Sequence, residues 1–120
     1  MTEKSNTEEK FEKPYHFADE GDKVSGIETA IYANGNHVKR FNLSTGQQVI
    51  VRELSGRDMM DIDKQIAANA KMSEIEELYM ITLFHYAVKI DGKQIPIEDF
   101  EKMRGKDYNK IKIAVQSINF

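Results

Sequence analysis

The feature that most constrains the fold is an alternating segment, residues 27–53, that two turn sequences interrupt. Apolar and β-branched side chains alternate from Ile27 to Ala33, and Asn34-Gly35 follows directly. Asn-Gly tolerates the positive φ angles that both central residues of a two-residue type I′ turn require. The sequence therefore predicts a strand that enters a tight hairpin, and a second strand that runs from His37 to Leu43.

The second turn sequence, Ser44-Thr45-Gly46, fixes how the next two strands pair. Its glycine suits the left-handed position of a three-residue hairpin loop, because glycine has no Cβ that would clash there. This loop places Phe41 opposite Val49 and begins a third strand, Gln48–Glu53. One face of the small sheet then gathers four apolar side chains, which are Phe41, Leu43, Val49 and Val51.

Two long helices are predicted after the third strand. The first runs from Ser55 to Ala70, and Asp58, three residues after Ser55, gives it a start that resembles a capping box. The second begins at Ser73 and stops near Lys89, with apolar side chains on most of its sides. A helix of this kind lies at the centre of a core or is buried by self-association.

The last third of the chain is predicted to contain a short clip and two further helices. Val88–Ile95 form a two-stranded clip, Ile97–Met103 form a short helix, and Asp107 caps the final helix. The expected fold is α+β: a small N-terminal antiparallel β-hairpin or sheet followed by a bundle of three to four helices. We expect it to form a single domain over residues 27–120.

An acidic arm, residues 1–26, precedes this domain and carries the whole net charge of −3. The arm holds seven acidic residues and four lysines, whereas residues 27–120 balance at thirteen of each sign. Its apolar side chains are isolated among charges, so it has little surface to bury against the entropy of ordering. We expect the arm to be disordered.

No residue pattern in the sequence points to catalysis, a cofactor or a metal. There is no cysteine, and no two of the three histidines, His16, His37 and His85, show the spacing of metal ligands on a helix. The seven glycines fall singly and form no phosphate-binding loop. We therefore expect a protein that is not an enzyme, and an acid–base enzyme that uses His85 with a nearby acid is the alternative.

A basic stretch, residues 102–112, provides the second alternative, a small nucleic-acid-binding regulatory protein. It contains five cations interleaved with acids, and the acidic arm opposes phosphate binding; the cations are Lys102, Arg104, Lys106, Lys110 and Lys112. A membrane partner is not expected, because no apolar run approaches the ~20 residues that a membrane span needs. The polar N-terminus shows no secretory signal, which favours a cytoplasmic protein.

Four segments resemble the tail assembly chaperones of long-tailed bacteriophages. They are Val49–Met60, Val88–Lys93, Ile97–Phe100 and Asp107-Tyr108, in an order that spans roughly residues 36–120. The resemblance implies a phage or prophage protein of the host cytoplasm that binds the tape measure protein and recruits tail tube subunits. It implies no catalysis and no cofactor.

Such a chaperone requires apolar surface that a partner can cover and then release. Met59 and Met60 are adjacent on the first predicted helix, so one of them faces outward, and methionine adapts to irregular partners. Ile113 lies off the apolar face of the last helix. The candidate partner-contact residues are Met59, Met60, Ile66, Ile113 and Phe120.

Overall fold

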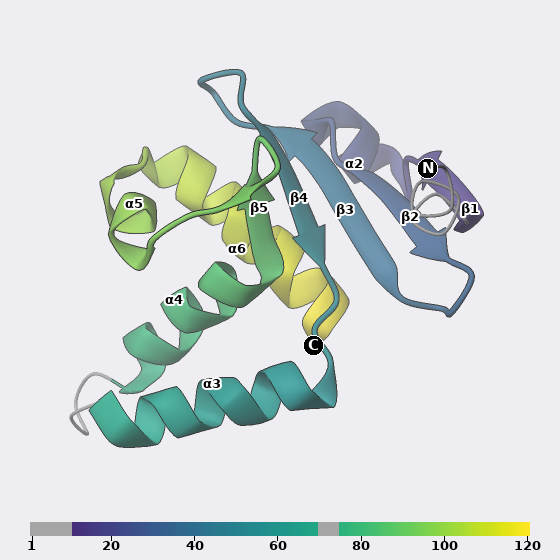
Figure 1. The fold of residues 1–120 in the computed structure, drawn as a ribbon. Helices are drawn as coiled ribbons and strands as arrows, with labels where there is room; N and C mark the ends of the chain where they lie inside the picture. Colours follow the sequence, from purple (N-terminus) through teal and green to yellow (C-terminus); the bar gives the residue numbers. More distant parts are fainter. Residues whose placement is uncertain (1–10, 70–74) are drawn as a thin grey trace, which may run out of the picture.

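The computed structural model describes residues 11–69 and 75–120 as a six-stranded antiparallel sheet with five helices (Figure 1). Neighbouring strands in the sheet follow chain order. The strands are β1 (Phe11–His16), β2 (Glu28–Tyr32), β3 (His37–Asn42), β4 (Gln48–Arg52), β5 (Val88–Ile90) and β6 (Lys93–Gln94). The helices are α2 (Glu20–Ser25), α3 (Gly56–Asn69), α4 (Ile75–Ala87), α5 (Ile97–Lys102) and α6 (Gly105–Asn119).

The α+β class is confirmed, but the sheet is larger than the predicted hairpin. The expected clip exists as β5 and β6, and β5 also pairs with β4 through Val49 opposite Ile90 and Val51 opposite Val88. At the other edge, β1 pairs with β2. Sequence periodicity could not assign these outer strands to the sheet, because their partners are distant in the chain.

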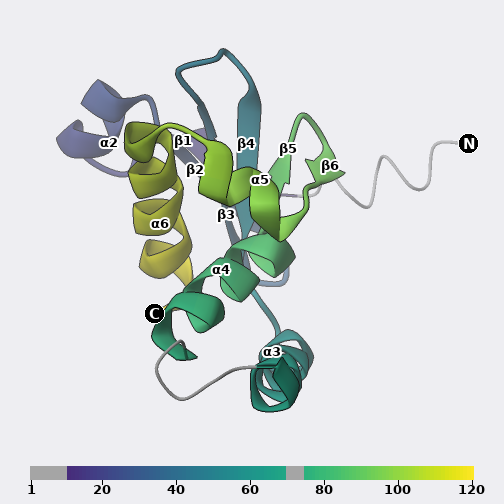
Figure 2. The same cartoon turned by 90° about the vertical axis from the view of Figure 1, so that its left-hand side faces the viewer.

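The helices form a layer on one face of the sheet rather than a separate bundle (Figures 1 and 2). Helix α6 packs against β3 and β4, and α4 contacts α3, α5 and α6. Phe84 of α4 is fully buried in this layer, with its ring 5.5 Å from that of Phe100 in α5 and 5.2 Å from that of Tyr108 in α6. The predicted apolar sheet face lies beneath the helices, and all four of its side chains are buried.

The second hairpin has the predicted register, whereas the first turn differs from the prediction. Phe41 pairs with Val49 across a three-residue loop in which Gly46 has a φ of +89°. The first turn is also a three-residue loop, because Gly35 alone takes a positive φ (+93°) and the Tyr32 amide donates to the Asn36 carbonyl. Asn34 keeps a negative φ, so the type I′ turn is wrong at this position.

The arm prediction does not hold for residues 11–26, which form β1 and α2; residues 1–10 lie outside the described part of the chain. The Phe11 ring stacks on Tyr32 at 4.9 Å, and the Tyr15 ring lies 3.7 Å from the Arg40 guanidinium carbon. Partial burial raises the pKa of the Tyr15 hydroxyl. These aromatic side chains find partners on the sheet, so the domain boundary expected after residue 26 falls inside the fold.

Of the predicted helix caps, the one at the start of α3 is confirmed and the one at the start of α6 is wrong. The Ser55 hydroxyl accepts from the Asp58 amide at 3.1 Å and the Asp58 carboxylate accepts from the Ser55 amide at 3.0 Å, which confirms the capping box. Asp107 is not the cap of α6, because the helix begins at Gly105 after Arg104. The start predicted at Ser73 and the helix end predicted at Ala70 lie outside the described residues.

Candidate functional site

The five predicted contact residues separate into exposed and packed side chains. Met60, Ile113 and Phe120 are 56%, 62% and 70% exposed. Met59 is half-buried against the core, and Ile66 is only 8% exposed inside it. Ile66 is therefore removed from the contact surface, because the stripe that predicted its helix also turns its side chain inward.

Two further apolar side chains, Phe17 and Val24, are exposed and are not among the five predicted contact residues. Both lie in the segment expected to be disordered, Phe17 between β1 and α2 and Val24 on α2. Val24 is 85% exposed on a helix that has no buried residue. An isolated apolar residue among charged residues does not indicate a contact surface in the sequence, because its exposure depends on how the surrounding segment packs.

A groove lies between α2 and α6, which are side by side on the helix-covered face of the sheet (Figure 2). Its volume is about 560 Å³. Polar and cationic side chains line it together with two isoleucines; the lining comprises Gly21, Asp22, Ser25, Ile27, Lys106, Asn109, Lys110 and Ile113. The exposed Ile113 thus forms one wall of a concave, partly basic surface.

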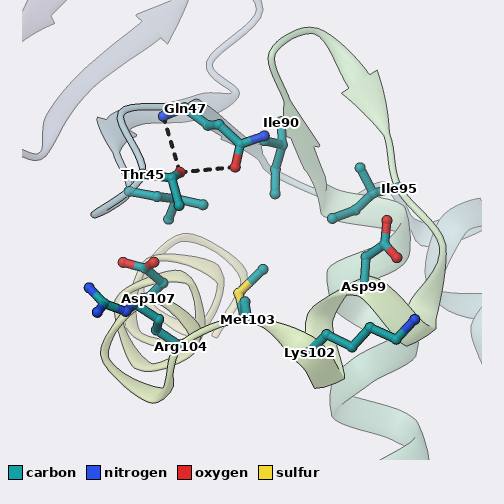
Figure 3. Close-up of a pocket in the computed structure, with 10 residues that line it drawn as sticks. Thr45, Gln47, Ile90, Ile95, Asp99, Lys102, Met103, Arg104 and Asp107 are labelled. Carbon is teal, nitrogen blue, oxygen red and sulfur yellow. Dashed lines mark hydrogen bonds between the residues drawn. The ribbon is translucent and has the colours of Figure 1, made fainter.

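A second concavity of about 350 Å³ opens where the β3–β4 loop faces α5 and the start of α6 (Figure 3). Leu43, Ile90, Ile95 and Met103 provide its apolar lining. Charged side chains at its edge have both signs, and they are Asp99, Lys102, Arg104 and Asp107. The Thr45 hydroxyl donates to the Gln47 side-chain carbonyl at 2.9 Å across the loop (Figure 3).

Asp107 is the one buried acid of the described residues, and its carboxylate is occupied by Ser44. The Ser44 amide donates to Oδ1 at 3.0 Å and the Ser44 hydroxyl donates to Oδ2 at 2.7 Å. Burial alone would raise the pKa of Asp107, but these hydrogen bonds outweigh it and hold the pKa below its usual value, with help from Lys106 and Arg104. This carboxylate clamps α6 to the β3–β4 loop.

The histidines lie apart from one another and make local contacts. His85 Nδ1 lies 2.9 Å from the Ile95 carbonyl, which ties α4 to the segment after β6. His37 lies 3.4 Å from Glu53, and His16 lies 2.8 Å from the Pro14 carbonyl. Among residues 11–69 and 75–120, no three His, Asp or Glu side chains gather closely enough to hold a metal ion.

The basic stretch does not present one continuous face. Lys102 and Arg104 line the concavity of Figure 3, whereas Lys106 and Lys110 line the α2–α6 groove. The fifth cation of the stretch, Lys112, lines neither of these two concavities.

Within the described residues, no helix is both long and apolar enough to cross a membrane. Comparisons with protein-family models, with curated proteins and with solved structures find no match to this chain.

Proposed function

We propose that this chain is a tail assembly chaperone of a long-tailed phage or prophage. In this proposal it binds the tape measure protein, recruits tail tube subunits and catalyses no reaction. The resemblance of four sequence segments to that family motivates the proposal.

The spatial arrangement of those segments is the observation that supports it. Strand β4, from the first segment, pairs with β5, from the second. The third and fourth segments contribute Phe100 and Tyr108, whose rings both contact Phe84. Segments that are dispersed over the sequence thus pack against one another in the folded chain.

The exposed apolar side chains are the second support. A chaperone that is covered by a partner and later released needs apolar surface on the folded chain. Met60, Ile113 and Phe120 supply such surface without unfolding of the core. The nucleic-acid alternative has less support, because four of its five cations are divided between two concavities.

Co-expression with tail proteins tests the proposal. The tagged chain would be expressed with the tape measure protein and, separately, with the tail tube protein encoded beside it. We expect both to co-purify with the tagged chain, whereas a capsid protein of the same phage, used as control, does not. Failure to retain the tape measure protein at low and physiological salt would overturn the proposal, as would a gene neighbourhood without tail genes.

A further inference from the structure

Helix α6 and its C-cap residue Phe120 present a stripe of exposed side chains. Lys106, Ile113 and Phe120 follow one another at intervals of seven residues, which is close to two helical turns. They therefore lie on one face at a spacing of about 10 Å. Ile113 and Phe120 are two of the most exposed large apolar side chains of the described residues. We call these three residues the α6 stripe.

The α2–α6 groove runs along one flank of this stripe. Ile113 and Lys106 belong both to the stripe and to the groove wall, and Lys110 lies one turn beyond Lys106. Helix α2 has six residues and buries none of them, so it borders the groove without filling it. A concave surface with apolar side chains beside a helix is a geometry into which a second helix packs.

The wall of the α2–α6 groove carries more positive than negative charge, with two lysines and one aspartate. Asp22 on the groove wall is 3.9 Å from Lys39, a lysine whose side chain is only 12% exposed. In the described part of the chain, no carboxylate forms an ion pair with Lys106 or Lys110. Lys110 instead reaches the Asn42 carbonyl at 3.4 Å. The Lys110 ammonium also lies 5.4 Å from the centre of the Phe41 ring, so the exposed Lys106 is the lysine most open to a carboxylate of a partner.

We infer that the α6 stripe and the α2–α6 groove bind an acidic amphipathic helix of the partner protein. Two apolar side chains of that helix, seven residues apart, would cover Ile113 and Phe120. Carboxylates at one end would lie against Lys106 and Lys110. A helix fits because its own seven-residue interval repeats the spacing of the stripe. The inference rests on the proposed function for the identity of the partner, the tape measure protein.

Binding measurements with matched surface variants test the inference. Ile113→Asp places a charge at the centre of the stripe, and Phe17→Asp makes the same change at an exposed apolar position between β1 and α2, outside the stripe and the groove lining. Loss of a central apolar anchor typically costs ~2 kcal/mol or more, or about 30-fold in Kd. We expect at least that weakening of tape measure binding for Ile113→Asp and less than about threefold for Phe17→Asp.

A second pair of variants tests the charge. Lys106→Glu combined with Asn109→Glu reverses the groove wall, whereas Lys89→Glu combined with Lys93→Glu reverses exposed charge on β5 and β6. The groove variant should weaken binding by about tenfold at low salt and by less at high salt, because screening removes the difference. Replacing acidic residues of the bound tape measure segment by lysine should restore its binding to the groove variant. The same replacement should not improve its binding to the variant with Lys89→Glu and Lys93→Glu.

The outcomes separate the two proposals. If the unmodified chain does not bind the tape measure protein, the proposed function and the inference fail together. If it binds and Ile113→Asp binds equally well, the inference alone is overturned. If the groove variant binds as tightly as the unmodified chain, the inference that the partner helix is acidic is overturned. Circular dichroism and thermal melts confirm that each variant is folded before its affinity is compared.

Discussion

Asp58 and Asp107 are acids in the first turns of α3 and α6, yet their carboxylates have different partners. Asp58 closes a capping box with Ser55, three residues away, and also accepts from Arg52 at 2.9 Å. Asp107 reaches Ser44, 63 residues earlier in the chain. The first contact follows from local sequence, because a capping box lies within one helical turn, whereas the second depends on how α6 docks on the sheet.

Replacing Asp58 by alanine should lower the free energy of unfolding by about 1 kcal/mol, because it removes a helix cap and its hydrogen bond from Arg52. That hydrogen bond is also the main reason why the pKa of Asp58 lies below its ordinary value. Urea denaturation at pH 7 measures the change. Asp63→Ala, at an exposed position of the same helix, serves as control. Equal losses in the two variants would show that the cap is not stabilising.

The lowered pKa of Asp107 predicts that the free energy of unfolding depends on pH. Its pKa in the folded chain is lower than its ordinary value. Its contribution is therefore fully present above the ordinary carboxyl pKa near about 4 and is lost as the pH falls from there through the lower pKa of the folded chain. Asp107→Asn should lose stability at pH 7 and show a smaller further loss between about pH 5 and 3 than the unmodified chain. Urea titrations at each pH test this, with Asp99→Asn, an exposed acid, as control. A pH dependence unchanged by Asp107→Asn would contradict it.

Among the elements, β1 is the one that sequence patterning missed most clearly. Its aromatic residues have no periodicity of their own, and their partners Tyr32 and Arg40 lie on β2 and β3. Pro14 and two register shifts also disturb the alternation that usually identifies a strand. Phe11 and Tyr15 are held by contacts with β2 and β3, and these contacts exist only in the folded sheet.

Tyr15→Ala should destabilise the chain by about 1–2 kcal/mol, since it removes a half-buried ring and its cation–π contact with Arg40. Phe17→Ala, at the exposed aromatic just after β1, should change stability by less than about 0.5 kcal/mol. Thermal or urea unfolding compares the two. If both variants were as stable as the unmodified chain, β1 would not be docked on the sheet in solution.

At the scale of the whole molecule, the central position of α4 explains why its sequence is apolar on most sides. Leu83, Phe84 and Ala87 are buried, and α3, α5 and α6 surround the helix. The apolar belt that suggested self-association is thus largely covered within one chain, although Tyr79 and Ile81 remain half-buried. Self-association stays a prediction, which light scattering can decide.

Burial differs strongly between α4 and α2, and this predicts unequal protection against hydrogen exchange. The Leu83 amide lies in the core helix, whereas the Lys23 amide donates to the Asp19 carbonyl in a helix without buried residues. Leu83 should exchange only through global unfolding, and Lys23 through local opening that costs several kcal/mol less. Exchange followed by NMR measures both. Equal protection of the two amides would show that α2 opens only when the whole chain unfolds.

Features that depend on neighbours within a few residues could be predicted from the sequence. These are the β3–β4 register across Gly46, the capping box of α3, the short clip at Val88–Ile95 and the buried face of Phe41 and Val49. Each follows from steric limits at a turn, from side-chain reach within one helical turn, or from alternation along a strand.

Three features depend on long-range packing and became known from the folded chain: which outer strands join the sheet, that residues 11–26 are part of the fold, and which candidate contacts are exposed. Ile66 and Ile113 are equally apolar in the sequence, yet one is buried in the core and the other lines a groove. The difference arises because burial is set by what packs against a helix face, and those partners are distant in the chain. The α6 stripe is periodic in the sequence, but its exposure and its position beside α2 exist only in the folded molecule.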